Sequence, residues 1–172
     1  MANALIDIQP LDLRDNVFQA IGQDWMLLTA AAPDGFNTMT ASWGAWGELW
    51  DRRVCFAFVR PQRHTYAFME QAGHYTLSFF DEAYRKALDY CGAHSGRDVD
   101  KIAATGLTPA REPDGIVYFE EARLVFVCRK LYRQDLDPAC FMDPALPQAV
   151  YAKRDYHRMY VGEVVRCLAR RS

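Results

Sequence analysis

Hydrophobic and polar positions at the start of the chain follow a helical period and then the two-residue period of β-strands. Between residues 11 and 23 the apolar side chains recur at helical spacing, which predicts a short amphipathic helix. The apolar run at residues 25–32 predicts a buried strand, and the alternation at residues 36–43 predicts a second strand. A Pro-Asp-Gly sequence, which favours a tight turn, separates the two runs. The pattern therefore predicts a β-hairpin.

The rest of the chain continues with short strands and brief helices. Apolar runs predict strands at residues 53–59, 74–80, 116–119, 122–135 and 156–169, and helical spacing predicts helices at 65–72, 81–90 and 95–105. Prolines at 138, 144 and 147 indicate an irregular excursion before the last strand, in which Gly162 favours a bulge or a close backbone approach. About six strands predict a mainly β fold, an antiparallel β-barrel that is closed or partly closed, with helices at its open ends.

The composition is that of a globular protein. The chain has 172 residues, 51% hydrophobic and 24% charged, so we expect one domain over residues 1–172 with a full core and no separate cofactor domain. Twenty Lys and Arg against 22 Asp and Glu give a net charge of −2, which lacks the basic footprint of nucleic-acid-binding proteins. Aromatic residues make up 13% of the chain, and they suit either a core or a pocket for a planar ligand.

The cysteines and the first residues predict a cytoplasmic protein. The five cysteines form no C-x-x-C pair, and three of them, Cys55, Cys128 and Cys167, lie in apolar runs, which predicts reduced core thiols. The N-terminus has an early acidic residue and no basic segment before an apolar run, so no signal peptide is expected. The longest uncharged stretch, residues 25–33, is far shorter than the ~20 residues that span a bilayer. We therefore expect no membrane partner.

Several familiar catalytic motifs are absent from the sequence. Neither G-x-G-x-x-G nor G-x-x-x-x-G-K-[ST] occurs, which excludes a Rossmann pyrophosphate turn and a P-loop. Ser95 lies in Gly-Ala-His-Ser-Gly, which misplaces the first glycine of a nucleophile elbow. The four histidines, at 64, 74, 94 and 157, show no helical metal-ligand pairing, so no metal site is expected.

A first anion-binding pattern precedes the predicted helix at residues 65–72. Arg60 and Arg63 bring two guanidinium groups close to Thr65, whose hydroxyl could cap the helix. Positive charge, backbone N–H groups and the helix dipole would then converge on one anion, such as a phosphate. The alternative is an ordinary helix cap with solvated or paired arginines.

A second such pattern opens the predicted helix at residues 95–105. Ser95 and Asp98 match a capping box, and Arg97 and Lys101 add positive charges one helical turn apart. Here too the alternative is a simple cap. Two such elements in one small acidic domain favour a phosphate site.

A row of hydroxyl groups occupies one face of the strand predicted at residues 36–43. Thr38, Thr40 and Ser42 share this face, with Asn37 and Trp43 beside them. Such donors and acceptors can bind the edge of a planar heterocycle while aromatic rings cover its faces. The alternative is a set of solvent-facing threonines beside core tryptophans.

Four segments together resemble a known family. They are Asn-Thr-Met-Thr-Ala-Ser-Trp-Gly at 37–44, Val-Arg-Pro-Gln-Arg-His-Thr at 59–65, Tyr-Cys-Gly at 90–92 with Ser-Gly-Arg-Asp-Val-Asp-Lys at 95–101, and His-Arg-Met-Tyr-Val-Gly-Glu-Val at 157–164. In this order they resemble the signature segments of the flavin reductase-like, FMN-binding split-barrel family, and within it the flavoredoxin-like branch. The resemblance spans residues 24–165, nearly the whole chain.

The resemblance implies a six-stranded antiparallel split barrel that dimerises and binds FMN near the subunit interface. The residues that it places around the flavin ring and ribityl chain are Asn37, Thr38, Met39, Thr40, Ser42 and Trp43, and those toward the phosphate are Arg60, Arg63, Thr65, Ser95 and Lys101. It makes His157 the candidate catalytic residue, which would orient the flavin or an incoming nicotinamide; the alternative is an ordinary surface histidine.

The activity that the resemblance implies is that of an oxidoreductase. Bound FMN would accept hydride from NADH or NADPH and pass electrons to free flavin or another acceptor. One alternative is an FMN-containing electron-transfer module that a partner protein reduces without nicotinamide, and another is a non-redox ligand-binding or purely structural domain. Two departures stand out: His64 replaces a residue that is commonly aromatic, such as Tyr, and the 37–43 segment differs from that of the short reductases that serve flavin monooxygenases.

Overall fold

The computed structural model describes residues 4–170, so the first three residues of the N-terminal segment discussed above lie outside it. The strands are β1 (Leu5–Asp7), β2 (Met26–Ala32), β3 (Gly35–Ala41), β4 (Gly44–Leu49), β5 (Arg52–Val59), β6 (His74–Phe79), β7 (Pro109–Glu112), β8 (Ile116–Phe119), β9 (Leu124–Asp135) and β10 (Arg158–Arg170). The helices are α1 (Val17–Gln19), α2 (His64–Gln71), α3 (Arg85–Ala93), α4 (Lys101–Thr105) and α5 (Ala145–Val150). Short helical turns are η1 (Pro10–Asp12), η2 (Ala20–Asp24), η3 (Glu82–Tyr84), η4 (Pro113–Gly115) and η5 (Pro138–Cys140).

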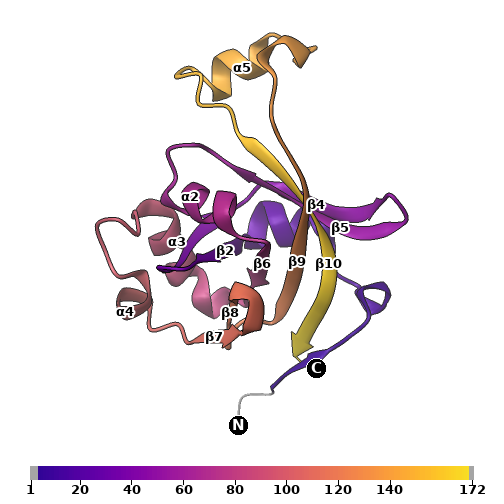
Figure 1. The fold of residues 1–172 in the computed structure, drawn as a ribbon, viewed down its shortest axis with the longest axis vertical. Helices are drawn as coiled ribbons and strands as arrows, with labels where there is room; N and C mark the ends of the chain where they lie inside the picture. The colour runs from indigo at the N-terminus through magenta and orange to yellow at the C-terminus, as the bar shows by residue number, and fades with distance from the viewer. Residues whose placement is uncertain (1–3, 171–172) are drawn as a thin grey trace.

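The main sheet is antiparallel and has eight strands. Its order is β3-β2-β6-β9-β10-β5-β4, with β1 paired to one end of β10, while β7 and β8 form a separate two-stranded sheet. In the described part of the chain β3 and β4 are the two ends of this order, so the sheet is not closed. The mainly β antiparallel fold with peripheral helices is confirmed, whereas the prediction of six strands is wrong. Figure 1 shows long β9 and β10 at the centre, the β4–β5 hairpin on one side and α2, α3 and α4 on the other.

The hairpin predicted at the start of the chain is confirmed. β2 and β3 pair antiparallel from Met26 opposite Ala41 to Ala32 opposite Gly35. Gly35 has φ +134°, a conformation that residues with a side chain rarely adopt, so the Pro-Asp-Gly turn depends on glycine at this place.

Strands at the middle of the sheet are buried on both faces. In β2, Leu28 packs into one hydrophobic cluster together with Phe126 of β9, whereas neighbouring Leu27 packs into a second cluster with Leu88 of α3. Val125 of β9 also belongs to the second cluster. Because successive side chains of a strand point to opposite faces, α3 covers the face opposite to the barrel interior. Such burial explains why these strands appear in the sequence as continuous apolar runs.

Gly162 lies at a β-bulge, as the sequence predicted. The register between β10 and β9 shifts between Val161 and Gly162. A Cβ at Gly162 would lie 2.6 Å from the hydroxyl oxygen of Tyr75 and 2.8 Å from the Cβ of Cys128. Glycine therefore allows β10 to pass close to a buried tyrosine.

The helix predictions need three corrections. Residues 11–23 form no continuous helix. The turn η1 is followed by a break, and helical structure resumes at α1 and η2. The Asn16 side chain caps α1 by accepting hydrogen bonds from the Phe18 and Gln19 N–H groups. Residues 81–90 begin as the 3₁₀ turn η3, and α3 extends to Ala93. The helix predicted at 95–105 is only the five-residue α4. The proline-rich excursion is confirmed, and it projects from the barrel with η5 and α5 (Figure 1).

The cysteines are all free thiols. Cys55, Cys128 and Cys167 are buried, as their apolar sequence context predicted, and Cys91 is buried as well, while Cys140 is exposed. Among residues 4–170, no helix combines the length and the hydropathy that a membrane crossing requires.

Candidate functional site

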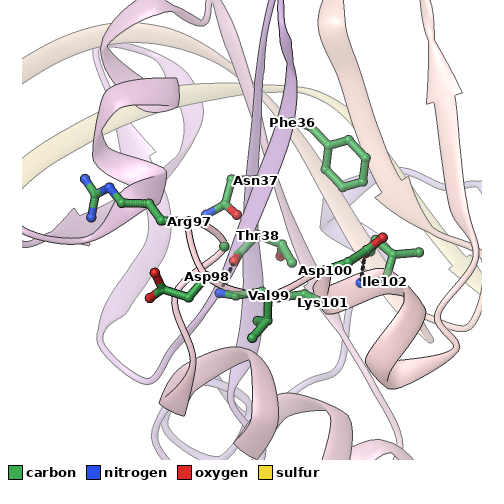
Figure 2. Close-up of a pocket in the computed structure, with 10 residues that line it drawn as sticks. Phe36, Asn37, Thr38, Arg97, Asp98, Val99, Asp100, Lys101 and Ile102 are labelled. Atoms are coloured by element: carbon green, nitrogen blue, oxygen red, sulfur yellow. Dashed lines mark hydrogen bonds between the residues drawn. The ribbon is translucent and has the colours of Figure 1, made fainter.

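A cleft of about 240 Å³ lies between β3, the start of α2 and the turn that precedes α4. Six of the predicted flavin-binding residues line it: Asn37, Met39, Arg63, Thr65, Ser95 and Lys101. A second cleft of about 440 Å³ borders the first and shares with it Asn37, Gly96, Arg97, Asp98 and Lys101 (Figure 2). The fold thus brings together segments that are far apart in the sequence.

The start of α2 has no side-chain cap, contrary to the prediction for Thr65. The N-cap residue is Arg63, which makes no capping hydrogen bond through its side chain. Thr65 lies inside the helix, and its buried hydroxyl oxygen accepts a hydrogen bond of 2.7 Å from the Asn37 side-chain amide. The Thr65 hydroxyl therefore joins α2 to β3 instead of capping the helix. His64 and Thr65, the first residues of α2, line the cleft, and the uncapped amide groups of a helix start favour an anion.

The predicted capping box at Ser95 and Asp98 is also wrong. The Ser95 hydroxyl accepts a hydrogen bond of 3.2 Å from the Arg97 backbone N–H, and the Asp98 N–H donates to the Ser95 carbonyl at 3.0 Å, so these residues form a turn. Asp100 caps α4 through hydrogen bonds from Ile102 and Ala103. Asp100 directly precedes Lys101, the first residue of α4, so its carboxylate is better placed than Ser95 to cap the helix.

Gly96 brings this turn against β3. A Cβ at Gly96 would lie 2.0 Å from the Asn37 side-chain oxygen, closer than any non-bonded contact allows. A larger residue at this position would displace the Asn37 side chain and disturb its hydrogen bond to Thr65. Gly96, Asn37 and Thr65 together form a continuous wall of the cleft.

Lys101 is buried at the border of the two clefts and joins two elements. Its side chain is 6% exposed, and its Nζ donates hydrogen bonds to the Thr38 carbonyl at 2.7 Å and to the Cys91 carbonyl at 2.8 Å. Figure 2 shows the first of these bonds between α4 and β3. Burial lowers the pKa of Lys101 to about 8, so the ammonium group is charged at neutral pH. Its charge contributes to a positive potential in the cleft.

Two arginines and a single carboxylate complete the charges of this cleft. The Arg63 guanidinium donates to the Gly92 carbonyl at 3.0 Å, and its burial lowers the pKa of Arg63 from the ordinary value. Arg97 donates to the Gln62 carbonyl at 3.3 Å. Arg63, Arg97 and Lys101 outnumber the one acidic residue, Asp98, that lines the cleft. The electrostatic potential of the cleft is therefore positive, although the chain carries a net charge of −2.

The row of hydroxyl groups on β3 faces the protein interior. The Thr38 hydroxyl donates to the Leu28 carbonyl at 3.3 Å and accepts from the Thr29 hydroxyl at 2.9 Å. The Thr40 hydroxyl donates to the Leu88 carbonyl of α3. These two threonines share one face, as the alternation predicted, but their hydroxyls are used in internal hydrogen bonds. Asn37 and Met39, on the other face, line the cleft instead.

Arg60 lies outside both clefts, although it follows the same pattern as Arg63. Its guanidinium forms an ion pair of 2.5 Å with Asp155 and donates to the Val150 carbonyl at 3.1 Å. It also lies 5.2 Å from the centre of the Tyr151 ring. The alternative reading of a paired arginine thus holds for Arg60. Its partners come from the proline-rich excursion, 90 residues or more further along the chain, and no local sequence signal marks them.

His157 belongs to an aromatic cluster next to Arg60. Its Nδ1 lies 2.7 Å from the Tyr151 hydroxyl, and its ring centre lies 5.2 Å from that of Trp43. His157 is 8% exposed and so is not a surface histidine, whereas Trp43, after the end of β3, is half exposed. Burial, reinforced by the charge of Arg60, lowers the pKa of His157 to about 4. His157 is therefore neutral at physiological pH. Tyr151 was missed in the sequence because it follows no motif.

We expect this burial to make the fold sensitive to mild acid. The pKa of His157 in the folded state, about 4, is below the ordinary value of 6.5, so the unfolded chain binds more protons and stability falls as pH drops from 6.5 toward 4. His157→Gln, which keeps a hydrogen-bonding group but does not titrate, should reduce the Tm loss over this range by roughly 6–12 °C, because this pKa difference amounts to about 3 kcal/mol at pH 4 and each 1 kcal/mol shifts Tm by about 2–4 °C in a chain of this size. Calorimetry of both proteins at several pH values measures this; parallel Tm profiles would contradict the assignment.

Comparisons with known proteins agree with this geometry. The family model described as flavin reductase like domain matches residues 18–172. Among solved structures, an FMN-binding domain of a flavin reductases-like enzyme from Shewanella baltica shares 14% identity with a TM-score of 0.69, and the match covers 99% of this chain and 79% of that one. Flavoredoxin of Desulfovibrio vulgaris shares 21% identity with a TM-score of 0.66, covering 94% and 76%. An NADH:FAD oxidoreductase from Streptomyces globisporus shares 14% identity with a TM-score of 0.65, covering 85% and 74%. A search of curated proteins finds no match. At these identities the structures show a shared fold.

Proposed function

Because the chain belongs to the flavin reductase-like domain family, we propose that it is an FMN-binding oxidoreductase that accepts hydride from NADH or NADPH and passes electrons to free flavin or another acceptor. The observation that carries this proposal is the cation-lined cleft at the uncapped start of α2. FMN ends in a phosphate dianion, and the cleft offers helix amides together with charged donors for such a group.

In this proposal the phosphate lies among the residues at the start of α2 and the turn before α4. Arg63 supplies a charged donor at the cleft, Ser95 supplies a short polar side chain, and Lys101 supplies a buried positive charge. Thr65 acts by fixing Asn37, since its hydroxyl already accepts a hydrogen bond. Arg97 adds a further cation that lines both clefts.

The residues of β3 and the positions after it would hold the rest of the flavin. Asn37 and Met39 present a polar and an apolar side chain to the cleft, whereas Thr38 and Thr40 contribute through their backbone because their hydroxyls are bonded elsewhere. In this proposal Ser42 and Trp43, directly after β3, also contact the flavin, and the Trp43 ring lies next to His157. When bound, FMN supplies the redox chemistry, and the protein orients it and excludes water.

We place His157 where it orients the flavin or an incoming nicotinamide. Its ring is neutral, held by the Tyr151 hydroxyl on one side and packed near Trp43 on the other. A neutral imidazole can donate or accept one hydrogen bond without adding charge next to a hydride donor. The half-exposed Trp43 ring offers a flat surface for a planar ring.

We also propose that the chain folds as a single domain and forms a cytoplasmic homodimer.

The alternative function is an FMN-containing electron-transfer module that a partner protein reduces, and the fold shared with flavoredoxin supports it. Both functions require the same flavin cleft, and they differ in the electron donor.

Anaerobic spectroscopy tests this proposal. The purified protein should be yellow, and NADH or NADPH should bleach its visible flavin band. If only a reduced ferredoxin-like protein bleaches the band, the electron-transfer function replaces the reductase. If the protein carries no flavin and added FMN does not bind, both functions fail and the non-redox ligand-binding domain is left.

A further inference from the structure

One buried polar atom beside the cation-lined cleft has no partner. His64, the first residue of α2, lines the cleft, and its Nδ1 is buried without a hydrogen bond. The other cleft histidine, His94, is different: its Nδ1 lies 3.1 Å from the Tyr90 carbonyl, and its ring stacks on Tyr90 with centres 4.0 Å apart. An unpaired polar atom in a buried position is costly, so it indicates that something else satisfies it in the working protein.

The surroundings of His64 disfavour its protonated form in the absence of an anion. Arg97 and Asp98 face it from the turn before α4, Lys101 faces it from α4, and the Phe68 ring packs edge-on at 5.1 Å from its own helix. Burial is the largest cause that lowers the pKa of His64, the two cations lower it further, and Asp98 opposes them. Arg63 lines the same cleft from the residue before it.

We infer that His64 is a proton-coupled ligand of this cleft, neutral when the cleft is empty and protonated when a phosphate dianion binds. The inference rests on the proposed function, since it takes the terminal phosphate of FMN as the anion. Two negative charges next to the ring outweigh the repulsion from Arg97 and Lys101, and they give the imidazolium a partner for its N–H groups. The proton comes from solvent, and no covalent bond changes.

The coupling predicts the sign of the pH dependence. If the anion makes His64 bind a proton, FMN affinity rises as pH falls through the region near neutrality. The phosphate itself acts in the opposite direction, because its second pKa is about 6 and binding favours its dianion. Lys101, whose pKa is about 8, would also take up a proton at higher pH. The contribution of His64 is therefore isolated by comparing variants between pH 6.5 and 7, where Lys101 is already charged.

Calorimetry of FMN binding to the flavin-free full chain, in buffers of different ionisation enthalpy, counts the protons taken up. We expect the wild type to take up roughly half a proton per FMN more than His64→Phe, which corresponds to an affinity that changes about threefold more per pH unit. His64→Phe keeps a ring against Phe68, and His64→Gln serves as a second variant if the first is unstable. Riboflavin, which has no phosphate, should show the same proton count in wild type and variant.

His94→Phe is the matched control, because it removes a histidine from the same neighbourhood whose Nδ1 already has a partner. It should keep the wild-type proton uptake. Equal uptake by the wild type and His64→Phe, or a loss in His94→Phe instead, would overturn the inference while leaving FMN binding intact. Failure of FMN to bind at any pH would instead reject the proposed function.

Discussion

Arg63→Gln should weaken FMN binding by roughly 10- to 100-fold and leave riboflavin binding nearly unchanged. The Arg63 guanidinium lines the cleft at the start of α2, where it would donate a charge-assisted hydrogen bond to the phosphate. Such a bond contributes about 1.5–3 kcal/mol, and each 1.4 kcal/mol is a factor of ~10 in Kd. Riboflavin lacks the phosphate, so its Kd should change by less than about threefold. Titration of intrinsic flavin fluorescence gives both constants.

Arg60→Gln is the informative comparison for this prediction. Arg60 lies three residues earlier in the same loop, yet its charge is paired with Asp155 and it lines neither cleft. We expect this variant to discriminate between FMN and riboflavin as the wild type does. If Arg60→Gln weakens FMN as selectively as Arg63→Gln, or if Arg63→Gln weakens both flavins equally, the phosphate does not lie where we place it.

Gly162→Ala should destabilise the fold strongly. The added methyl group would lie 2.6 Å from the Tyr75 hydroxyl oxygen and 2.7 Å from a carbon of the Tyr75 ring, and this ring is buried. The hydroxyl donates to the Cys55 carbonyl at 2.8 Å, so moving the ring also breaks a buried hydrogen bond. Overpacking costs about 1–3 kcal/mol and a broken buried hydrogen bond about 1–3 kcal/mol. We expect a total near 3 kcal/mol, a Tm lower by roughly 6–12 °C.

Gly47→Ala controls for the intrinsic effect of the substitution in a strand. Gly47 lies on β4, and a Cβ there would have nothing within 4 Å. Its Tm should stay within about 2 °C of the wild type. Thermal unfolding of the three proteins measures the difference, and a Gly162→Ala variant as stable as Gly47→Ala would show that β10 does not pass Tyr75 this closely.

Local patterns predicted the strands that carry their own signal. β2 and β3 were predicted because an apolar run and an alternating run flank a Pro-Asp-Gly turn, and β8 was predicted with the bounds it has. β4 was missed because two of its six residues are glycines, which weaken the sequence signal of a strand. Hydrogen-bonded pairing with β5 holds this segment in the strand conformation. Strand number depends on such pairings between distant segments, so the predicted number of six strands was wrong.

The site was predicted at the level of segments and missed at the level of atoms. The sequence placed arginines and hydroxyls around α2 and α4, and the cleft is there. It could not show that Asn37, 28 residues away, binds the Thr65 hydroxyl, or that Asp155, 95 residues away, pairs with Arg60. A hydroxyl near a helix start looks like a cap unless its distant partner is known, and charges look free unless their partners are known. Lys101 likewise appeared only as a positive charge toward the phosphate, and only the fold shows it buried against the Thr38 carbonyl.

The central claim is that the cation-lined cleft at the start of α2 holds the phosphate of FMN. Equilibrium titration of the flavin-free wild-type chain with FMN and with riboflavin tests it most directly. We predict that FMN binds at least about 100-fold more tightly than riboflavin, since a dianion in this cleft gains helix amides and charged donors worth about 3 kcal/mol, and that inorganic phosphate competes with FMN only. Equal affinity for the two flavins would contradict the account.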